Sequence, residues 1–430
     1  MTARWLLKIT AMNCGATTRR LPGTMRSRIQ MNSPSNKPVQ MISFVYALLT
    51  FSVLRDFIIA VLLLLPLAIF AQDLDDTERM LRELSEAPGV SGYEEPAAQV
   101  FMKYLKPYAD ELQRDRLGSV IAIKKGTAES PRVMIDAHLD EIGFMVKRLD
   151  ENGFVKFFPL GWNFSQQLLD HRVIIHTRNG PVLGVINTGP DIDESKIILR
   201  EEMWIDVGVE NRVEAEALGI QPADPITHES KFAVMNNRKF LLGKAWDDRI
   251  GLGVIIGVLK NLAREKHPNM VFATGAVQEE ITLSGAKTVV EAVKPDIAIT
   301  LDIDVTSDLP VNTSIDYAQP VLGKGVVFIL HTSEMLPHVK LRQWVQSIAA
   351  ELKIPHQFML EEGGGTDAGP IHKWNLGVPT LDLVISQRYY HSANGIIHRD
   401  DYESAVKLIT EVVKRLDKKI LDALTFKPLE

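Results

Sequence analysis

Five polar clusters along the chain carry side chains that can bind divalent metal ions. The clusters are AHLDEIGF (137–144), KAWDDRIG (244–251), VQEEI (277–281), LDIDVTSD (301–308) and RYYHSANG (388–395). Imidazole and carboxylate groups together form a donor set that holds zinc, cobalt or manganese without thiolates. The sequence has a single cysteine, Cys14, which excludes disulfides, cysteine–zinc sites and thiol catalysis for the folded body.

Taken singly, each cluster also has a purely structural interpretation. His138 fits a buried core histidine, Asp247 fits a helix cap, and Glu279 with Glu280 fits a solvated turn. Taken together, the five clusters all follow a predicted strand or open a predicted helix. Binding sites of open α/β sheets form outside the carboxyl ends of the strands. We therefore expect the clusters to converge on one metal site.

From residue 73 onward, the hydrophobic periodicity predicts alternating helices and strands. Helices are predicted over 75–85, 94–112, 247–264, 284–293, 341–352 and 400–423. Strands are predicted over 119–126, 131–138, 269–277, 295–302, 325–330 and 378–386. Apolar strands that alternate with helices are typical of a mostly parallel sheet covered on both faces.

The segment between residues 145 and 239 has a different character. Short β-like stretches, such as HRVIIHT (171–177) and PVLGVI (181–186), are separated by Gly, Pro, Asn and Asp, which predicts a small barrel or sandwich. The predicted fold class is therefore α/β, with a mixed, mostly parallel sheet flanked by helices and an inserted small β-rich domain. The expected domains are a leader (1–71), a discontinuous catalytic domain (73–144 and 240–430) and the insert (145–239).

The first 71 residues indicate a targeting segment. Residues 57–71, FIIAVLLLLPLAIFA, form an uncharged apolar run, but this run is shorter than the roughly 20 residues of a membrane-spanning helix. We expect a signal segment that exports the protein to the periplasm or the extracellular space. A cytoplasmic or membrane-tethered protein is the alternative, and membrane contact is expected only through the leader.

The charge of the chain is unevenly distributed. The formal net charge is −6, and seven basic residues but no acidic one fall within residues 1–40. The remaining body is acidic and has no basic stripe. Binding to nucleic acid requires clustered Lys and Arg, so nucleic acid is not an expected partner.

The motifs AHLDEIGFMV, KAWDDRIG, QEE, PDIAITLD, GGTDAGP and RYYHS resemble those of metallopeptidase family forty-two. This family comprises cocatalytic dinuclear-metal aminopeptidases, among them glutamyl and leucyl aminopeptidases that build tetrahedral assemblies. The motifs occur in the family's order and spacing between about Pro88 and His391. The insert falls between His138 and Asp247, whereas related carboxypeptidases and deacylases carry these two ligands much closer together. The resemblance implies a zinc-exopeptidase-like fold.

The resemblance also implies two divalent metal ions per subunit, Zn²⁺, Co²⁺ or Mn²⁺, bridged by Asp247. One ion would also be held by His138 and Asp302, and the other by Glu280 and His391. A bridging carboxylate is typical of two-metal hydrolytic sites. In enzymes that this chain resembles, a cis peptide bond follows the bridging aspartate, so we expect one between residues 247 and 248.

Two further acids have expected catalytic roles. The resemblance assigns Glu279 as the general base that takes a proton from a water bridged by the two metal ions. On an extended backbone Glu279 and Glu280 point in opposite directions, so that one can bind metal while the other faces the water. Asp140 lies two residues after His138 and is expected to accept the free N–H of its imidazole.

The resemblance implies a metal-dependent aminopeptidase that hydrolyses the N-terminal peptide bond of short peptides. It also implies a homo-oligomer built from dimers, up to a dodecamer, which the insert helps to assemble. The alternatives are a carboxypeptidase or amide deacylase on the same scaffold, and a non-catalytic peptide-binding homologue. Asp304 stands where the family motif has a small residue, which leaves the preferred N-terminal residue open.

Overall fold

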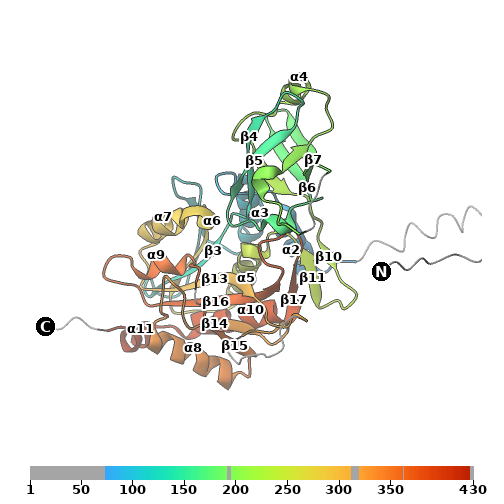
Figure 1. Cartoon of the computed structure of the whole chain (residues 1–430). Helices are drawn as coiled ribbons and strands as arrows, with labels where there is room; N and C mark the ends of the chain where they lie inside the picture. Colours follow the sequence, from blue (N-terminus) through green and yellow to red (C-terminus); the bar gives the residue numbers. More distant parts are fainter. Residues whose placement is uncertain (1–72, 191–194, 311–318, 362, 427–430) are drawn as a thin grey trace, which may run out of the picture. The chain divides into compact units, whose positions relative to one another are not determined.

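The structure is a computed structural model that describes residues 73–190, 195–310, 319–361 and 363–426 (Figure 1). The leader predicted over 1–71 lies outside these residues, so the leader and the export that it implies stay predictions. Within the described ranges, no helix is both long and apolar enough to cross a membrane.

In the described residues, eleven strands form one large mixed sheet (Figure 1). Its main path runs β1 (Glu111–Arg114), β2 (Val120–Lys125), β12 (Met270–Ala276), β3 (Arg132–His138), β13 (Ile297–Val305), β16 (Thr380–Arg388), β17 (Gly395–His398), β11 (Phe240–Gly243) and β10 (Ala233–Val234). Strands β14 (Val326–Ile329) and β15 (His356–Met359) join through β16. The predicted α/β fold class is confirmed, and the parallel pairing lies mainly in the four adjacent strands β12, β3, β13 and β16.

Helices cover both faces of this sheet. They are α2 (Asp76–Glu86), α3 (Glu95–Leu105), α5 (Trp246–Leu262), α6 (Glu279–Thr282), α7 (Ser284–Val293), α8 (Val339–Glu351), α9 (Ala368–His372), α10 (Arg399–Arg415) and α11 (Lys418–Leu424). Side chains of a strand alternate between its faces. On β3, Val133 and Ile135 pack into the core shared with α5 and α10, whereas Met134 packs into the core shared with α7. This burial on both faces explains why the central strands read as continuous apolar runs.

Two predicted helices were wrong at their C-terminal ends. The helix predicted over 94–112 ends at Leu105, and residues 111–114 form the exposed edge strand β1. Pro107 has no N–H group with which to continue the helical hydrogen bonds. The helix predicted over 400–423 is divided into α10 and α11, because the side chain of Asp417 caps a new helix by accepting from the N–H of Ile420 at 2.8 Å.

The insert forms a closed barrel with its own core. Around the barrel, the strand order is β4 (Gly143–Leu149), β5 (Val155–Leu160), β8 (Trp204–Asp206), β7 (Gly180–Asn187), β6 (Arg172–Thr177) and β9 (Pro225–His228). The segment also contains α4 (Arg212–Ala217) and two 3-10 turns, Ser165–Gln167 and Arg200–Glu202. Strand β4 begins five residues after β3 ends, so the barrel directly adjoins the C-terminal end of a central strand.

A buried charge network holds the segment after β3 against the segment that leads into α5. The Nζ of Lys244 donates to both carboxylate oxygens of Glu141, at 2.5 and 2.6 Å. The guanidinium of Arg249 is fully buried and donates to the backbone carbonyls of Leu139 (2.8 Å) and Ala87 (2.8 Å). A charge removed from water requires such compensation.

We expect Lys244→Met to lower the free energy of unfolding by about 3–5 kcal/mol, because it removes both Nζ hydrogen bonds of the buried Glu141 carboxylate and leaves, among the described residues, only the Arg249 guanidinium, 3.8 Å away, as its counter-charge. Chemical denaturation at fixed protein concentration measures this loss. The matched control is Lys231→Met, which removes an exposed lysine 3.5 Å from Glu86 and is expected to cost less than about 1 kcal/mol. Equal effects of the two variants would contradict the assigned role of the buried pair.

Candidate metal centre

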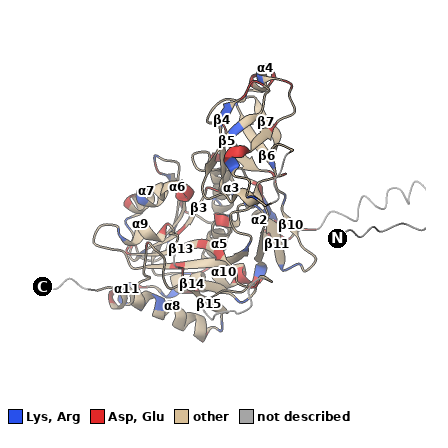
Figure 2. Cartoon of the chain, viewed as in Figure 1, with Lys and Arg blue, Asp and Glu red and all other residues tan. Residues whose placement is uncertain are grey.

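The parallel register brings the predicted site residues to one edge of the sheet. Thr300 of β13 pairs with Asp136 of β3, which places Asp302 beside His138 at the strand ends. Ala276, near the end of β12, pairs with His138 from the other side. The chain then continues from β12 into α6, which has acidic residues in its first turn and is drawn partly red in Figure 2.

Asp247 lies at the start of α5 and contacts both predicted histidine ligands. Its Oδ1 is 2.8 Å from Nε2 of His138, and its Oδ2 is 3.2 Å from Nε2 of His391. The peptide bond between Asp247 and Asp248 is cis, as predicted. His391 comes from the segment between β16 and β17, so its contact with Asp247 joins two distant parts of the chain.

The predicted ligands form two groups that share Asp247. In the first group, one ligand atom from each of His138, Asp247 and Asp302 lies within 4.8 Å of the others. In the second group, Asp247, Glu280 and His391 satisfy the same condition. The five residues that the sequence singled out as metal ligands are thus neighbours in space.

The prediction that Glu279 and Glu280 lie on an extended backbone was wrong. Gln278 adopts a left-handed conformation (φ 58°), and Glu279 opens the short helix α6. Both glutamates still reach the cluster: Oε2 of Glu279 is 4.0 Å from Nε2 of His138, and Oε2 of Glu280 is 3.6 Å from Nε2 of His391. Helical geometry therefore separates the two side chains, in place of the alternation of a strand.

Asp140 contacts the site differently from the prediction. The imidazole Nδ1–H of His138 donates to the backbone carbonyl of Asp140 (3.0 Å), while the nearer carboxylate oxygen lies at 3.6 Å. The Asp140 carboxylate accepts the backbone N–H groups of Glu279 (3.0 Å) and Glu280 (3.2 Å), and the hydroxyl of Ser91 (2.5 Å). Asp140 thus fixes the tautomer of His138 through its backbone and the position of α6 through its side chain.

The two imidazoles determine the charge of Asp247, the carboxylate that the two groups share. Burial opposes ionisation of Asp247, but hydrogen bonds from His138 and His391 outweigh it and lower the pKa of Asp247 below its usual range. Burial likewise opposes the protonation of His138, yet the carboxylates of Asp140 and Asp247 raise the pKa of His138 well above its usual value.

The other acids of the cluster have too few positively charged neighbours to balance their carboxylates. Burial, together with neighbouring carboxylates, raises the pKa values of Glu279, Glu280 and Asp302 well above the usual range. Among the described residues, the buried Oε1 of Glu280 and Nδ1 of His391 have no hydrogen-bond partner. Divalent cations fit this arrangement, because they supply the missing charge and accept nitrogen and oxygen ligands.

A cavity of about 620 Å³ opens beside the cluster. Its lining includes residues that no sequence motif indicated, among them Trp162 and Glu361, and it also includes Tyr390 of the RYYHS motif. Trp162 reaches the cavity from the loop after barrel strand β5 and is 65% exposed. Its ring is tilted against Phe164 (5.6 Å), which makes an edge contact with Tyr390 (5.9 Å) beside His391. The barrel thus contributes a wall of the cavity.

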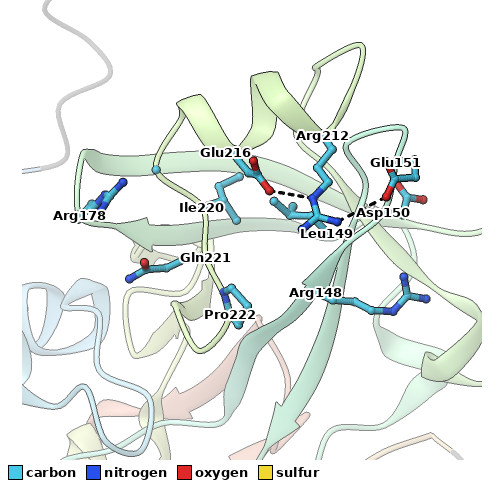
Figure 3. Close-up of a pocket in the computed structure, with 11 residues that line it drawn as sticks. Arg148, Leu149, Asp150, Glu151, Arg178, Arg212, Glu216, Ile220, Gln221 and Pro222 are labelled. Atoms are coloured by element: carbon cyan, nitrogen blue, oxygen red, sulfur yellow. Dashed lines mark hydrogen bonds and ion pairs between the residues drawn. The ribbon is translucent and has the colours of Figure 1, made fainter.

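A second cavity lies on the barrel, away from the cluster (Figure 3). Arg212 pairs there with Glu216 (2.8 Å) and Glu151 (3.5 Å). The guanidinium groups of Arg148 and Arg178 lie apart from one another and from this pair (Figure 3). Because its charges are paired or dispersed, this cavity has neither a metal-ligand cluster nor a convergent anion site.

Comparisons with known proteins show the family to which the chain belongs. Residues 118–408 match the M42 glutamyl aminopeptidase family. A lysyl aminopeptidase of Pyrococcus furiosus is 31% identical over 347 residues, which cover 78% of this chain and 96% of the relative.

Two solved structures extend this similarity to the fold. The TET aminopeptidase of the marine sediment archaeon Thaumarchaeota archaeon SCGC AB-539-E09 has a TM-score of 0.79 at 36% identity, and the match covers 82% of this chain and 100% of that one. The TET1 peptidase of Pyrococcus horikoshii has a TM-score of 0.71 at 29% identity, with 79% and 100% covered.

The mixed sheet carries a cluster of imidazoles and carboxylates that could hold metal ions, and the family match makes the chain a metal-dependent peptidase. The chain belongs to the M42 glutamyl aminopeptidase family. It is therefore a metal-dependent aminopeptidase and a hydrolase, and the family resemblance seen in its motifs is confirmed.

We expect Asp140→Asn to lower metal affinity or kcat about 10- to 100-fold, because an amide nitrogen cannot accept the N–H groups that hold α6. Competition with a chelator measures the affinity. The matched control is Asp150→Asn on the barrel, where Asp150 accepts the backbone N–H groups of Asn152 (3.0 Å) and Phe154 (2.9 Å) at the second cavity, away from the cluster. An unchanged Asp140→Asn enzyme would refute the positioning role.

Proposed function

We propose that the enzyme removes N-terminal residues from short peptides at a pair of divalent metal ions bridged by Asp247. His138 and Asp302 would complete the ligands of one ion, and Glu280 and His391 those of the other. The membership of Asp247 in both ligand groups carries this proposal. One carboxylate with two oxygens facing two separate groups is the arrangement that a two-metal hydrolytic site requires.

In this proposal Glu279 acts as the general base. When bound, the metal ions supply Lewis acidity that polarises the scissile carbonyl and lowers the pKa of water. Glu279 lies beside the first ligand group without belonging to either, so its carboxylate is free to move a proton. Glu279 takes the proton of the attacking water and passes it to the leaving nitrogen as the peptide C–N bond breaks. The products are a free amino acid and a shortened peptide.

The cavity supports removal of a single residue. Its volume of about 620 Å³ is in the range of small-ligand sites, which suits one or two residues of a peptide. The set of nitrogen and oxygen donors accepts Zn²⁺, Co²⁺ or Mn²⁺. The family description names glutamyl substrates and the Pyrococcus furiosus relative is named for lysyl ones, so these names do not agree on the N-terminal residue.

We expect Glu279→Gln to lower kcat about 10²- to 10⁴-fold on peptides with a free N-terminus while the protein still binds two metal ions per chain. Elemental analysis measures the metal content, and His391→Ala or His138→Ala should each lower it toward one.

Glu291→Gln serves as the control for the glutamate variant, because Glu291 lies on α7, outside the cavity, and accepts the Trp374 indole N–H at 2.8 Å. Full hydrolysis by Glu279→Gln would refute the assignment of the base. If the wild-type protein binds one metal ion per chain, the proposed pair of metal ions is refuted but the assignment of Glu279 as the base is not. If the enzyme cleaves N-terminally blocked peptides, a deacylase is favoured.

We propose further that the enzyme is a homo-oligomer and that the insert (145–239) takes part in its assembly. The Pyrococcus horikoshii relative is described as assembling into a tetrahedron or a large octahedral shell. The barrel of this chain exposes the apolar side chains of Phe158 on β5 and of Leu183 and Val185 on β7. Exposed apolar groups of this kind are typical of association surfaces.

Light scattering of the purified protein is expected to give a multimer. The double variant Leu183→Glu, Val185→Glu is expected to give a smaller particle, because it places charges on the apolar barrel surface. Lys407→Glu, a charge change on the exposed side of α10 and outside the insert, is the control. A monomeric wild-type protein would contradict the proposal, and an unchanged mass of the double variant would exclude these barrel residues from the interface.

A further inference from the structure

The cavity beside the metal centre has acidic residues that the proposed metal ligands do not include. Asp304, Glu334 and Glu361 line the cavity, and we call them the acidic wall. Asp304 lies two residues after Asp302 on β13, and alternate residues of a strand project from the same face. The carboxylate of Asp304 therefore lines the cavity beside the metal centre, although Asp304 belongs to neither ligand group.

Glu361 is held in place by its own backbone. Its N–H donates to the carbonyl of His331 (3.0 Å), and its carbonyl accepts from Nδ1–H of the same residue (2.7 Å). Gly364 lies against its carboxylate with φ +73°, and a Cβ at this position would overlap Oε1 of Glu361. The glycine-rich loop after β15 thus leaves room for a carboxylate at this wall.

The three acids differ in their counter-charges. Glu334 is paired with Nζ of Lys373 at 2.6 Å. In the part of the chain that the structure describes, no Lys or Arg forms an ion pair with Asp304 or Glu361. Among the described residues, the hydrogen bond that the Asp304 side chain accepts comes from the neighbouring backbone N–H of Val305 (2.5 Å). Burial and the neighbouring Asp382 raise the pKa of Glu361 to about 7, and His331 offsets this rise only in part. A positive charge is therefore missing from this wall.

We infer that Asp304 and Glu361, the two acids of this wall without a paired lysine or arginine among the described residues, form the subsite for the side chain of the N-terminal residue and that this subsite selects a basic residue, lysine or arginine. Asp304 and Glu361 are the specificity-determining residues, and the inference rests on the proposed aminopeptidase function. A lysine ammonium or an arginine guanidinium supplies the charge that the two carboxylates lack. A neutral side chain leaves them unpaired, and an acidic side chain is repelled.

The same carboxylates have one competing role, which is to bind the α-ammonium group of the substrate. Every aminopeptidase substrate carries this group, so its loss would slow all substrates equally. A side-chain subsite instead affects basic substrates selectively. The ratio of rates for basic and neutral substrates therefore separates the two roles.

The first experiment compares kcat/KM for lysyl, arginyl, norleucyl and glutamyl anilides with the metal-loaded full chain. Norleucine has the carbon chain of lysine without its ammonium group, so it isolates the effect of charge. We expect lysyl and arginyl substrates to exceed the norleucyl one about 10- to 100-fold, the range of a charge-assisted hydrogen bond, and the glutamyl one by more.

The isosteric variants Asp304→Asn and Glu361→Gln are each expected to lower the ratio of lysyl to norleucyl rates about tenfold, with the norleucyl rate nearly unchanged. The matched control is Glu334→Gln, which removes an acid of the same wall that Lys373 already neutralises, and which is expected to keep the ratio. Equal losses on all four substrates, or a wild-type preference for norleucyl or glutamyl anilide, would overturn the inference.

The second experiment measures binding without turnover. Calorimetry with Glu279→Gln is expected to give at least about tenfold tighter binding of lysinamide than of norleucinamide, and the double variant Asp304→Asn, Glu361→Gln in this background should remove the difference. If lysinamide binds selectively but the wild-type enzyme hydrolyses no peptide, the proposed function is refuted and the subsite is kept. Hydrolysis and binding without basic preference would refute the subsite and keep the function.

Discussion

The carboxylate shared between two imidazoles determines where every other part of the site must lie. An aspartate side chain is short, so His138 and His391 can both reach Asp247 only if the loop after β16 folds back over the start of α5. The same contacts keep Asp247 ionised, whereas burial raises the pKa values of Glu280 and Asp302 on either side of it. The site therefore gathers more carboxylates than its own imidazoles can balance, and this excess makes it a cation site.

Such an excess of charge can persist only on a rigid support. The Asp140 carboxylate accepts two backbone N–H groups of α6 and the Ser91 hydroxyl, so three segments are joined by one side chain. Directly behind it, Lys244 neutralises Glu141, and Arg249 uses its donors on backbone carbonyls. These contacts hold the ligands in position before any ion enters. The binding energy of an ion is then not used to order the chain.

The sequence predicted which residues come together, because each belongs to a motif at a strand end or a helix start, and parallel strands bring their ends to one edge. It failed where geometry depends on the residue at which an element stops. Glu279 and Glu280 would alternate on a strand, but β12 ends before them and a helical turn begins. Asp140 uses its carbonyl toward His138, which no spacing rule distinguishes from use of its side chain. Trp162 and Glu361 carry no motif, and only tertiary folding brings a barrel loop and a glycine-rich loop to the same cavity.

The cavity shows which of its charges the fold itself compensates. The chain provides Lys373 for Glu334 but no cation for Asp304 or Glu361 within the described residues, although all three line one wall. Leaving a partly buried carboxylate unpaired reduces the stability of the folded protein, and a nearby lysine or arginine would relieve the cost. When unpaired carboxylates lie inside an active-site cavity, the simplest source of the compensating positive charge is the substrate that binds there. Metal ions satisfy this need for the ligand carboxylates, and a substrate side chain satisfies it for the wall beside them.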